Sequence, residues 1–597
     1  MEATKAKTFL KGGEFLVKES TADTTFSRDF VSEEQEMFGQ TAHDFIVNRV
    51  QPNVQKIDKQ APELVMELLK ESAELGLLGA TIPEEYGGMS VDLATDTIIN
   101  EEIGKGHSWA AAFAAHTGIG TLPILYYGTT EQKNKYLPGL VDGSIKAAYC
   151  LTEPGSGSDA LGARTKAVLT EDGKHYVLNG QKMWITNGGF ADIFTVFAKI
   201  DGDKFTGFIV DAKSEGISLG SEEDKLGIKG SSTRQVFFNN VKVPAENILG
   251  EIGKGHKIAF NVLNIGRYKL AALALGGSKK SISVATKYAN ERIQFNVPIS
   301  SFGAIKHKLA EMAIKSYACE SATYRTAGLI DDRINDLAAN GMDRVQAKLV
   351  AAEEYSIECA ILKVFGSEVL DYVVDETVQV FGGTGFSEEY PAARAYRDAR
   401  INRIFEGTNE INRLLAVGML VKKAMKGEVD LFTPAMAVQK ELMSVPDFST
   451  PDSEDYFAAE KTALKNAKKA ILMTAGAGVQ KFMQAFEKEQ EIIMNISDML
   501  IELFVCESTL LRTERLVAVK GLEAASLQVD MTRAYISDAL ERINLSGKHA
   551  ITAFNEGDTL RIMLMGLKRF TKYEPVNTIA MRRRVADKLI EANEYCF

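Results

Sequence analysis

The chain has 597 residues, of which 45% are hydrophobic and 25% charged, a composition typical of a globular protein with several domains. Its formal net charge of −11 argues against non-specific binding of nucleic acid. The five cysteines are scattered and form no C-x-x-C pair, so the sequence suggests neither a disulfide framework nor a metal site.

The N-terminal part begins with an arm, residues 1–30, followed by a helical block, residues 31–146. Residues 1–20 lack the apolar core of a secretory signal and the Arg-rich character of a transit peptide, and no apolar run could span a bilayer. We therefore expect a cytoplasmic protein of a prokaryote. Pro62–Leu78 places apolar residues at helical spacing and ends at Gly76 and Gly79. No phosphate-binding G-x-G-x-x-G follows a strand, so a Rossmann fold is not expected.

The period changes in residues 147–255, where short segments rich in Val, Phe, Tyr and Ile alternate with turn signals such as Asn179-Gly180. Strands of this length and spacing predict a compact antiparallel sandwich or barrel that ends near Pro244. The expected strands are His175–Leu178, Ile193–Ala198, Phe205–Val210 and Gln235–Val241.

Helical spacing returns in residues 256–427, where Ala271–Glu291, Phe302–Asp332 and Val345–Phe381 are each long enough for a helix of a bundle. The glycine pair that follows, Gly382-Gly383, suggests a tight backbone with little room for side chains.

A C-terminal region, residues 428–597, follows the bundle. Ser444–Glu454 has the composition of a linker, and amphipathic helices follow it. One of them, Lys461–Lys481, has Leu464, Ala467, Ile471 and Ala475 along one side, with Lys468 inside that apolar arc. This pattern fits either a helix lying on a membrane surface or an ordinary helix with a solvated face, and the second interpretation is favoured.

Three segments carry residues suited to chemistry, and the first is Tyr149–Ala160. Its glycines let backbone N–H groups approach a ligand, while Thr152, Ser156 and Ser158 add hydroxyl groups. Such a loop suits a nucleotide cofactor, although most Gly/Ser-rich loops are only connections.

The second segment, Lys182–Gly188, ends a strand. Trp184 there can lie against a planar cofactor, and the Thr186 hydroxyl can bond a ring nitrogen. The competing interpretation is a core tryptophan beside a turn.

The third segment is Arg400–Glu410. Thr408 is a predicted helix N-cap, with Glu410 in the first turn. Glu406 then precedes the helix, in an apolar setting expected from Ile404 and Phe405, where a carboxylate gains a raised pKa and can act as a general base. A surface glutamate is the alternative.

Together these segments resemble the acyl-CoA dehydrogenase family, over about residues 26–426. The Y-C-x-T-E-P-G-x-G-S-D loop, the W-I-T-N strand end and the E-G-T loop occur in the family's order, with further matches at Asn264–Arg267, Glu291–Phe295 and Gln379–Gly383. The region from about Asp430 resembles the helical extension of the very-long-chain subgroup, whose members are usually dimers.

The resemblance implies an α+β multidomain fold: an α-helical N-terminal domain, a β-barrel middle domain, an α-helical bundle and an extra C-terminal α-helical domain. It also implies FAD as cofactor, bound between two chains of a homo-oligomer, here a dimer. Residues expected to hold FAD within one chain are Tyr149, Leu151, Thr152, Gly157, Ser158, Trp184, Ile185, Thr186, Thr408, Asn409 and Glu410. Those expected to reach the FAD of the neighbouring subunit are Arg292, Gln294, Phe295, Gln379, Val380, Gly382 and Gly383.

The activity implied is α,β-dehydrogenation of acyl-CoA to trans-2-enoyl-CoA in fatty acid β-oxidation. Glu406 would take the α-proton, and electrons would pass to an electron-transferring flavoprotein. Some relatives carry the base at a helix position that corresponds to Gly266, which leaves Glu406 as the candidate base in this chain. The residues expected to contact acyl-CoA are Ser158, Asn264, Arg267, Phe405 and Gly407.

Chain-length preference depends on Ala111 and Ala115, which match the positions that close the acyl pocket of medium-chain relatives. Small residues there would leave a deeper slot for long chains, since each buried CH₂ contributes about 0.8 kcal/mol. The equal alternative is an alanine-rich helix in close packing with its neighbours. In one departure from the family pattern, Asn296 replaces a glycine, and we expect it to keep the loop because asparagine tolerates left-handed backbone conformations.

Two rival functions stay open. An acyl-CoA oxidase would use the same residues with oxygen as the electron acceptor. A scaffold or assembly factor would keep the fold while its activity is secondary, although the presence of Glu406, Ser158 and Arg292 argues against it.

Overall fold

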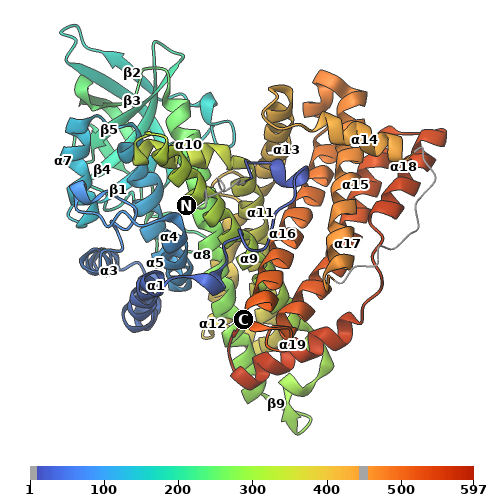
Figure 1. The fold of residues 1–597 in the computed structure, drawn as a ribbon. Coiled ribbons are helices and arrows are strands. Elements are labelled where there is room, and N and C mark those ends of the chain that lie inside the picture. Colours follow the sequence, from blue (N-terminus) through green and yellow to red (C-terminus); the bar gives the residue numbers. More distant parts are fainter. Residues whose placement is uncertain (1–9, 443–454) are drawn as a thin grey trace, which may run out of the picture.

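The computed structural model describes residues 10–442 and 455–597. A strand domain and a helical N-terminal block lie on one side of a long central bundle, and the C-terminal helices form a second bundle on the other side (Figure 1). The predicted α+β architecture with an additional C-terminal helical region is confirmed.

The N-terminal block is helical, as predicted. Its first long helix starts at a complete capping box, in which the Ser32 hydroxyl accepts from the Gln35 N–H at 3.2 Å and the Gln35 side chain accepts from the Ser32 N–H at 3.0 Å. The longer helices are α1 (Glu33–Phe45), α3 (Pro62–Glu74), α4 (Leu93–Ile103), α5 (Ser108–Ala115), α6 (Leu122–Tyr127) and α7 (Thr130–Val141).

The middle domain is an eight-stranded sheet in the order β6-β7-β3-β2-β4-β5-β8, with β1 added in parallel to β4. Most pairs are antiparallel, as the alternating pattern predicts. The sheet continues slightly past the predicted end at Pro244, because β8 pairs with β5. The strands are β1 (Ala147–Cys150), β2 (Lys166–Leu169), β3 (His175–Thr186), β4 (Ile193–Ile200), β5 (Lys204–Asp211), β6 (Ile217–Leu219), β7 (Thr233–Pro244) and β8 (Ile248–Leu249).

The prediction of a turn at Asn179-Gly180 is wrong, because both residues lie within β3. The pairing of β3 with β7 shifts register between Leu178 and Gly180, so this dipeptide forms a bulge. Gly180 has an extended backbone, and a Cβ atom there would collide with the Thr165 side chain. The glycine therefore serves a close approach between strands and no reversal of the chain.

The central bundle departs from prediction at two places. The expected single helix Val345–Phe381 is interrupted at Tyr355, whose hydroxyl donates to the Leu10 carbonyl of the N-terminal arm at 2.6 Å. Gly382 and Gly383 are not crowded, since added Cβ atoms would meet nothing within 4 Å; a φ of +61° is what favours glycine at position 382. The helices are α8 (Gly255–Glu291), α9 (Gly303–Ala339), α10 (Arg344–Glu354), α11 (Ser356–Phe381), α12 (Pro391–Ala399) and α13 (Asn409–Met425).

Helix α8 crosses α4 at a glycine, which leads to a prediction. A Cβ atom on Gly276 would overlap the carbonyl oxygen of Glu101, a backbone atom that cannot rotate away. We expect Gly276→Ala to lower the free energy of unfolding by about 1–3 kcal/mol, measured by urea denaturation. Gly418→Ala on α13, where nothing lies within 4 Å, is the control and should be neutral or slightly stabilising. Equal stabilities of the two variants would contradict this packing.

The C-terminal bundle packs onto the central one through α9, α13 and α16. The predicted linker Ser444–Glu454 lies outside the described residues. None of the described helices is long and apolar enough to cross a membrane. The helices are α14 (Phe432–Leu442), α15 (Ala458–Phe482), α16 (Gln490–Lys520), α17 (Ser526–Phe554), α18 (Gly557–Phe570) and α19 (Thr578–Ala592).

The apolar stripe of α15 is used inside the protein. Leu464, Ala467 and Ile471 are at most 3% exposed, and α15 packs against α16 and α17. Lys468, which breaks the stripe, pairs with Glu507 of α16 at 2.6 Å. The membrane-surface interpretation of this stripe is therefore wrong, and an ordinary helix with one solvated face is observed.

Arg512 of α16 joins the two bundles and the N-terminal arm. Its side chain is 2% exposed, with Nε at 2.6 Å from Asp29 of the arm and Nη1 at 2.7 Å from Glu320 of α9. The guanidinium group also lies over the Tyr317 ring, 4.1 Å from its centroid. The C-terminal region is thus attached through buried charges as well as apolar contacts.

Candidate active site

The candidate base Glu406 lies in a short loop between η12 (Arg400–Arg403) and α13. Its φ is +58°, a left-handed conformation that costs a non-glycine residue about 1–3 kcal/mol. Thr408 is the N-cap of α13, as predicted, and its hydroxyl accepts a hydrogen bond from the Ile411 N–H at 3.3 Å. The cap and the strained turn together fix the direction in which the Glu406 side chain emerges.

The Glu406 carboxyl group packs against the backbone of α8 at Gly266. A Cβ atom built on Gly266 would lie 2.7 Å from Glu406 Oε2 and 3.3 Å from Oε1. Oε2 is buried and has no hydrogen-bond partner among the described residues. The prediction that Ile404 and Phe405 bury this group is wrong, since they are 48% and 38% exposed; the contact with α8 buries it instead.

Two helices hold the main chain at Glu406. Arg267 of α8 donates from Nε to the Glu406 carbonyl at 3.2 Å and from Nη1 to Asn264 Oδ1 at 2.8 Å. Asn412 of α13 donates from Nδ2 to the carbonyls of Glu406 and Gly407 at 3.3 and 2.8 Å. The Glu406 N–H has no acceptor in the described part of the chain. Three predicted site residues therefore lie beside the candidate base: Asn264, Arg267 and Gly407. Arg267 holds the loop by its hydrogen bond to the Glu406 carbonyl.

Burial raises the pKa of the Glu406 carboxyl group to about 7, while the positive charges of Arg267 and Lys363 act in the opposite direction. Burial raises the pKa of the phenol of Tyr149, on β1, and the negative charge of the nearby Glu406 raises it further. A carboxylate with these properties is suited to accept a proton near neutral pH.

The Gly/Ser-rich loop after β1 is braced by a buried ion pair that the sequence analysis missed. Lys182 is fully buried, and its Nζ lies 2.7 Å from Glu153 Oε1 and 3.1 Å from the Leu151 carbonyl oxygen. Glu153 Oε1 also accepts from the Thr165 hydroxyl at 2.6 Å. The available signal was a lysine that alternates with Gly180 and Trp184 on one face of the strand, but its partner could not be inferred from spacing.

The outer part of this loop is open. Gly157 and Ser158 are exposed, Thr152 is half-buried, and Cβ atoms on Gly155 or Gly157 would meet nothing within 4 Å. The buried Tyr149 hydroxyl has no hydrogen-bond partner among the residues that the structure describes. The loop thus offers polar groups and a clear backbone to a ligand.

Trp184 closes the same region at the end of β3. It is 53% exposed, with a φ of +59°, beside a register shift in the strand, so the interpretation as a core tryptophan is wrong. Its neighbour Ile185 is 2% exposed and packs into the sheet, while Thr186 is half-buried. Asn187 then ties the strand end to α5, donating to the Ala112 carbonyl at 2.9 Å.

Comparison with known proteins matches most of the chain to one family. Family models described as acyl-CoA dehydrogenase N-terminal, middle and C-terminal domains match residues 32–144, 148–241 and 253–419, and a second C-terminal model matches residues 466–569. A probable acyl-CoA dehydrogenase of Bacillus subtilis (strain 168) is 48% identical over 99% of this chain and 100% of its own.

The chain belongs to the acyl-CoA dehydrogenase family.

A crystal structure of an acyl-CoA dehydrogenase complexed with FAD from Bacillus anthracis superposes with a TM-score of 0.96 at 48% identity, covering 99% of this chain and 100% of that one. The very long-chain specific acyl-CoA dehydrogenase of Rattus norvegicus mitochondria is 44% identical over 57% of this chain and 51% of its own. The similarity to the Bacillus anthracis protein includes the C-terminal extension.

The residues that the family resemblance assigns to the neighbouring subunit lie apart from Glu406. Arg292, Gln294 and Phe295 belong to the hairpin β9 (Ile293–Gln294) and β10 (Val297–Pro298), at the far end of α8. At 1.5 Å per residue, Arg292 is about 39 Å along α8 from Gly266. Figure 1 shows β9 well away from the strand domain. Asn296 has a φ of +65°, so the expected left-handed conformation is present, and Phe295 is 87% exposed.

The second predicted group, Gln379–Gly383, lies at the same end of the bundle. The Tyr288 ring at the end of α8 stacks on Phe381 at 3.9 Å between centroids. Gly382 and Gly383 are exposed, whereas the Val380 side chain is 4% exposed and leaves only its backbone for a ligand. Within one chain, the structure does not bring this group to the base.

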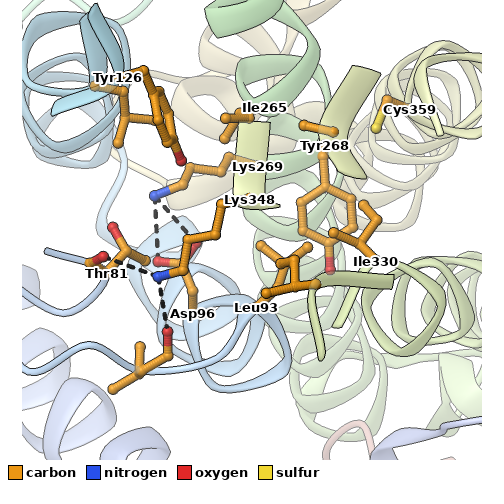
Figure 2. Close-up of a pocket in the computed structure, with 14 residues that line it drawn as sticks. Thr81, Leu93, Asp96, Tyr126, Ile265, Tyr268, Lys269, Ile330, Lys348 and Cys359 are labelled. Atoms are coloured by element: carbon orange, nitrogen blue, oxygen red, sulfur yellow. Dashed lines mark hydrogen bonds and ion pairs between the residues drawn. The ribbon is translucent and has the colours of Figure 1, made fainter. Parts of the chain in front are cut away.

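A cavity of about 50 Å³ lies between α4, α6, α8, α9 and α10 (Figure 2). Lys269 pairs with Asp96 at 3.1 Å, and Lys348 donates to the carbonyls of Thr81 and Val91 at 3.1 and 3.5 Å. Neither Ala111 nor Ala115 lines it. This space fits a few water molecules.

Proposed function

We propose that this protein is an FAD-dependent acyl-CoA dehydrogenase that removes the α and β hydrogens of an acyl-CoA thioester, with Glu406 as the base. The observation that carries the proposal is the buried Oε2 of Glu406, which has no hydrogen-bond partner among the described residues and lies against Gly266, in a loop held by Arg267 and Thr408. In a glutamate that only supports the fold, the buried carboxylate oxygens usually accept hydrogen bonds from other residues.

The residues present fit FAD. The half-exposed Trp184 ring offers a face to a planar group, and the open loop at Gly157 and Ser158 offers N–H and hydroxyl donors. The unpartnered Tyr149 hydroxyl faces the same region as Glu406. Leu151, Thr152, Ile185, Thr186 and the start of α13 (Thr408, Asn409, Glu410) complete the residues that would hold the cofactor.

The chain's own residues divide the work of the reaction. Glu406 Oε2 would accept the α-proton, and the unpaired Glu406 N–H would donate to the thioester carbonyl as negative charge develops there. Arg267 and Asn412 hold the loop through its carbonyls, and Phe405 would cover the thioester against water. When bound, FAD supplies the acceptor for the β-hydrogen and its electron pair.

The finer part of the proposal concerns substrate, acceptor and assembly. We propose long-chain acyl-CoA in fatty acid β-oxidation, with Ala111 and Ala115 at the end of the acyl slot, electron-transferring flavoprotein as acceptor, and a cytoplasmic homodimer. The similarity to the Rattus norvegicus very long-chain enzyme supports the chain length. The exposed Phe295 and the exposed Gly382-Gly383 backbone, distant from Glu406, support a cofactor contact across two subunits.

Anaerobic reduction of the flavin by acyl-CoA thioesters of graded chain length tests this function. We expect bleaching of the flavin absorbance, fastest with long chains, and transfer of electrons to electron-transferring flavoprotein. No bleaching with any acyl-CoA would reject the activity in favour of a scaffold role. Hydrogen peroxide release in air as fast as flavoprotein reduction would indicate an oxidase.

The activity should depend on pH through Glu406. Because the carboxyl group must be deprotonated to act as a base and burial raises its pKa to about 7, we expect kcat/KM to fall about tenfold per pH unit below that value. The pH profile of kcat/KM measures this directly. An acid limb near the ordinary value of 4.5 would contradict the burial of the base.

A further inference from the structure

Lys363 belongs to α11 and is fully buried. Its side chain lies beside the first residue of α13, the helix that follows the loop carrying Glu406. Its Nζ donates to Asn409 Oδ1 at 2.7 Å, and Asn409 is the first residue of α13. Asn409 is held in turn by Ser367 and Glu368, to which its Nδ2 donates at 3.0 Å each. Lys363 is thus linked through the Asn409 side chain to the helix that follows the Glu406 loop.

The environment of Lys363 differs from that of three other lysines with little exposure, each of which has a carboxylate partner. Lys182 has a carboxylate at 2.7 Å and Lys269 has one at 3.1 Å, and Lys279 of α8 has one at 2.6 Å. Lys363 has no carboxylate within salt-bridge distance in the described part of the chain, and its hydrogen-bond partner is a neutral amide.

This position is electrostatically costly. The N-terminus of a helix carries partial positive charge, which disfavours a cation there. Burial lowers the pKa of the Lys363 ammonium group to about 7, with the Glu406 charge acting most strongly in the opposite direction. A lysine buried at such a cost needs a reason beyond packing.

The charges that face this pair come from four elements. Lys363 interacts with Glu406 of the catalytic loop, Arg267 of α8, Glu368 of α11 and Glu410 of α13. Glu368 is already engaged by Arg413, with contacts of 2.8 and 3.0 Å, and Glu410 is exposed. Around Glu406 the groups are Arg267, Lys363 and, on β1, Tyr149. Glu406 is therefore the buried anion that remains for Lys363.

We propose that Lys363 is a positioning residue for the catalytic base: its buried charge favours the carboxylate form of Glu406, while its hydrogen bond to Asn409 holds the helix start that follows the loop. The role in catalysis rests on the proposed function, whereas the interaction between the two side chains does not. Each charge favours the ionised form of the other group.

Three variants separate charge from hydrogen bonding. Lys363→Gln keeps a donor for Asn409 and removes the charge, and Lys363→Arg keeps the charge. Lys348→Gln is the matched control, because Lys348 of α10 is half-buried and is likewise bonded to neutral oxygens. FAD content and circular dichroism of each variant establish that the fold is retained.

Infrared difference spectroscopy measures the pH at which the Glu406 carboxyl group loses its proton, with the band assigned by its loss in Glu406→Gln. This measurement needs no turnover. We expect the titration to move up by about one pH unit in Lys363→Gln and to stay near the wild-type value in Lys363→Arg and Lys348→Gln. The kcat/KM at pH 7 should fall about fivefold in Lys363→Gln, because the deprotonated fraction drops from about one half to one tenth.

The outcomes distinguish the two proposals. An unchanged carboxyl titration in folded Lys363→Gln would overturn the role of Lys363 even if the enzyme is active. A shifted titration in a protein that no acyl-CoA reduces would support the interaction and reject the proposed function. A similar shift in Lys348→Gln would also overturn the proposal, since the effect would then not be specific to Lys363.

Discussion

Glu406→Gln should bind FAD as the wild type does and yet reduce it about 10²–10⁴-fold more slowly with acyl-CoA. Glutamine has the size of glutamate and can occupy the space over Gly266, but its amide cannot accept the α-proton. Stopped-flow bleaching under anaerobic conditions measures this rate, and the protein-bound flavin spectrum measures cofactor content.

The control for this variant is Glu171→Gln, at an exposed turn of the strand domain. It removes the same charge and should bleach at the wild-type rate. Rapid bleaching by Glu406→Gln would show that another group accepts the proton. Loss of FAD from Glu406→Gln would instead show that the carboxylate is needed to build the site.

Arg512→Met should lower the free energy of unfolding by about 3–5 kcal/mol, because it leaves the half-buried Asp29 without its ion-pair partner and takes one of two cations from the buried Glu320, which keeps Lys279. Asp29 and Glu320 both lie within 2.7 Å of the guanidinium group, and Glu320 is 1% exposed. Methionine fills much of the volume against Tyr317, so the loss reflects the charges more than a cavity. Equilibrium urea denaturation measures the change.

Arg561→Met is the corresponding surface control. Its ion pair with Asp558 is exposed on both sides, 80% and 88%, so we expect a change of at most about 1 kcal/mol. If Arg512→Met were equally mild, the charges around Arg512 would contribute little to the attachment of the C-terminal bundle.

Local pattern was sufficient for much of the fold. Proline at the start of α3 and the capping threonine of α13 gave their positions, since those signals act within one turn of helix. The prediction at Asn179-Gly180 failed because the same dipeptide occurs in turns and in bulges, and the outcome depends on Thr165, which directly precedes β2. Tyr355 likewise interrupts a periodic apolar pattern at its contact with Leu10.

The candidate site was predictable as a set of residues and less so as an arrangement. The resemblance placed Glu406 and Gly266 in the same site, but the absence of a hydrogen bond to Oε2 is a property of the folded chain. Lys182 and Lys363 were missed because a buried lysine in a strand or helix looks like a surface residue until its partner is known. Ile404 and Phe405 show the converse error, where apolar neighbours in sequence were taken for apolar surroundings.

Arg413 of α13 would lose one of its partners in a form of this protein that lacks the C-terminal extension. It bonds Glu368 with both terminal nitrogens and reaches Asp498 of α16 with Nε at 2.7 Å, so the helix that follows the catalytic loop is anchored on the C-terminal extension. Removing the extension would take away that anchor and uncover the side of α13 that packs on α16. The loop would then need a surface supplied by another molecule, and turnover per chain would come to depend on protein concentration.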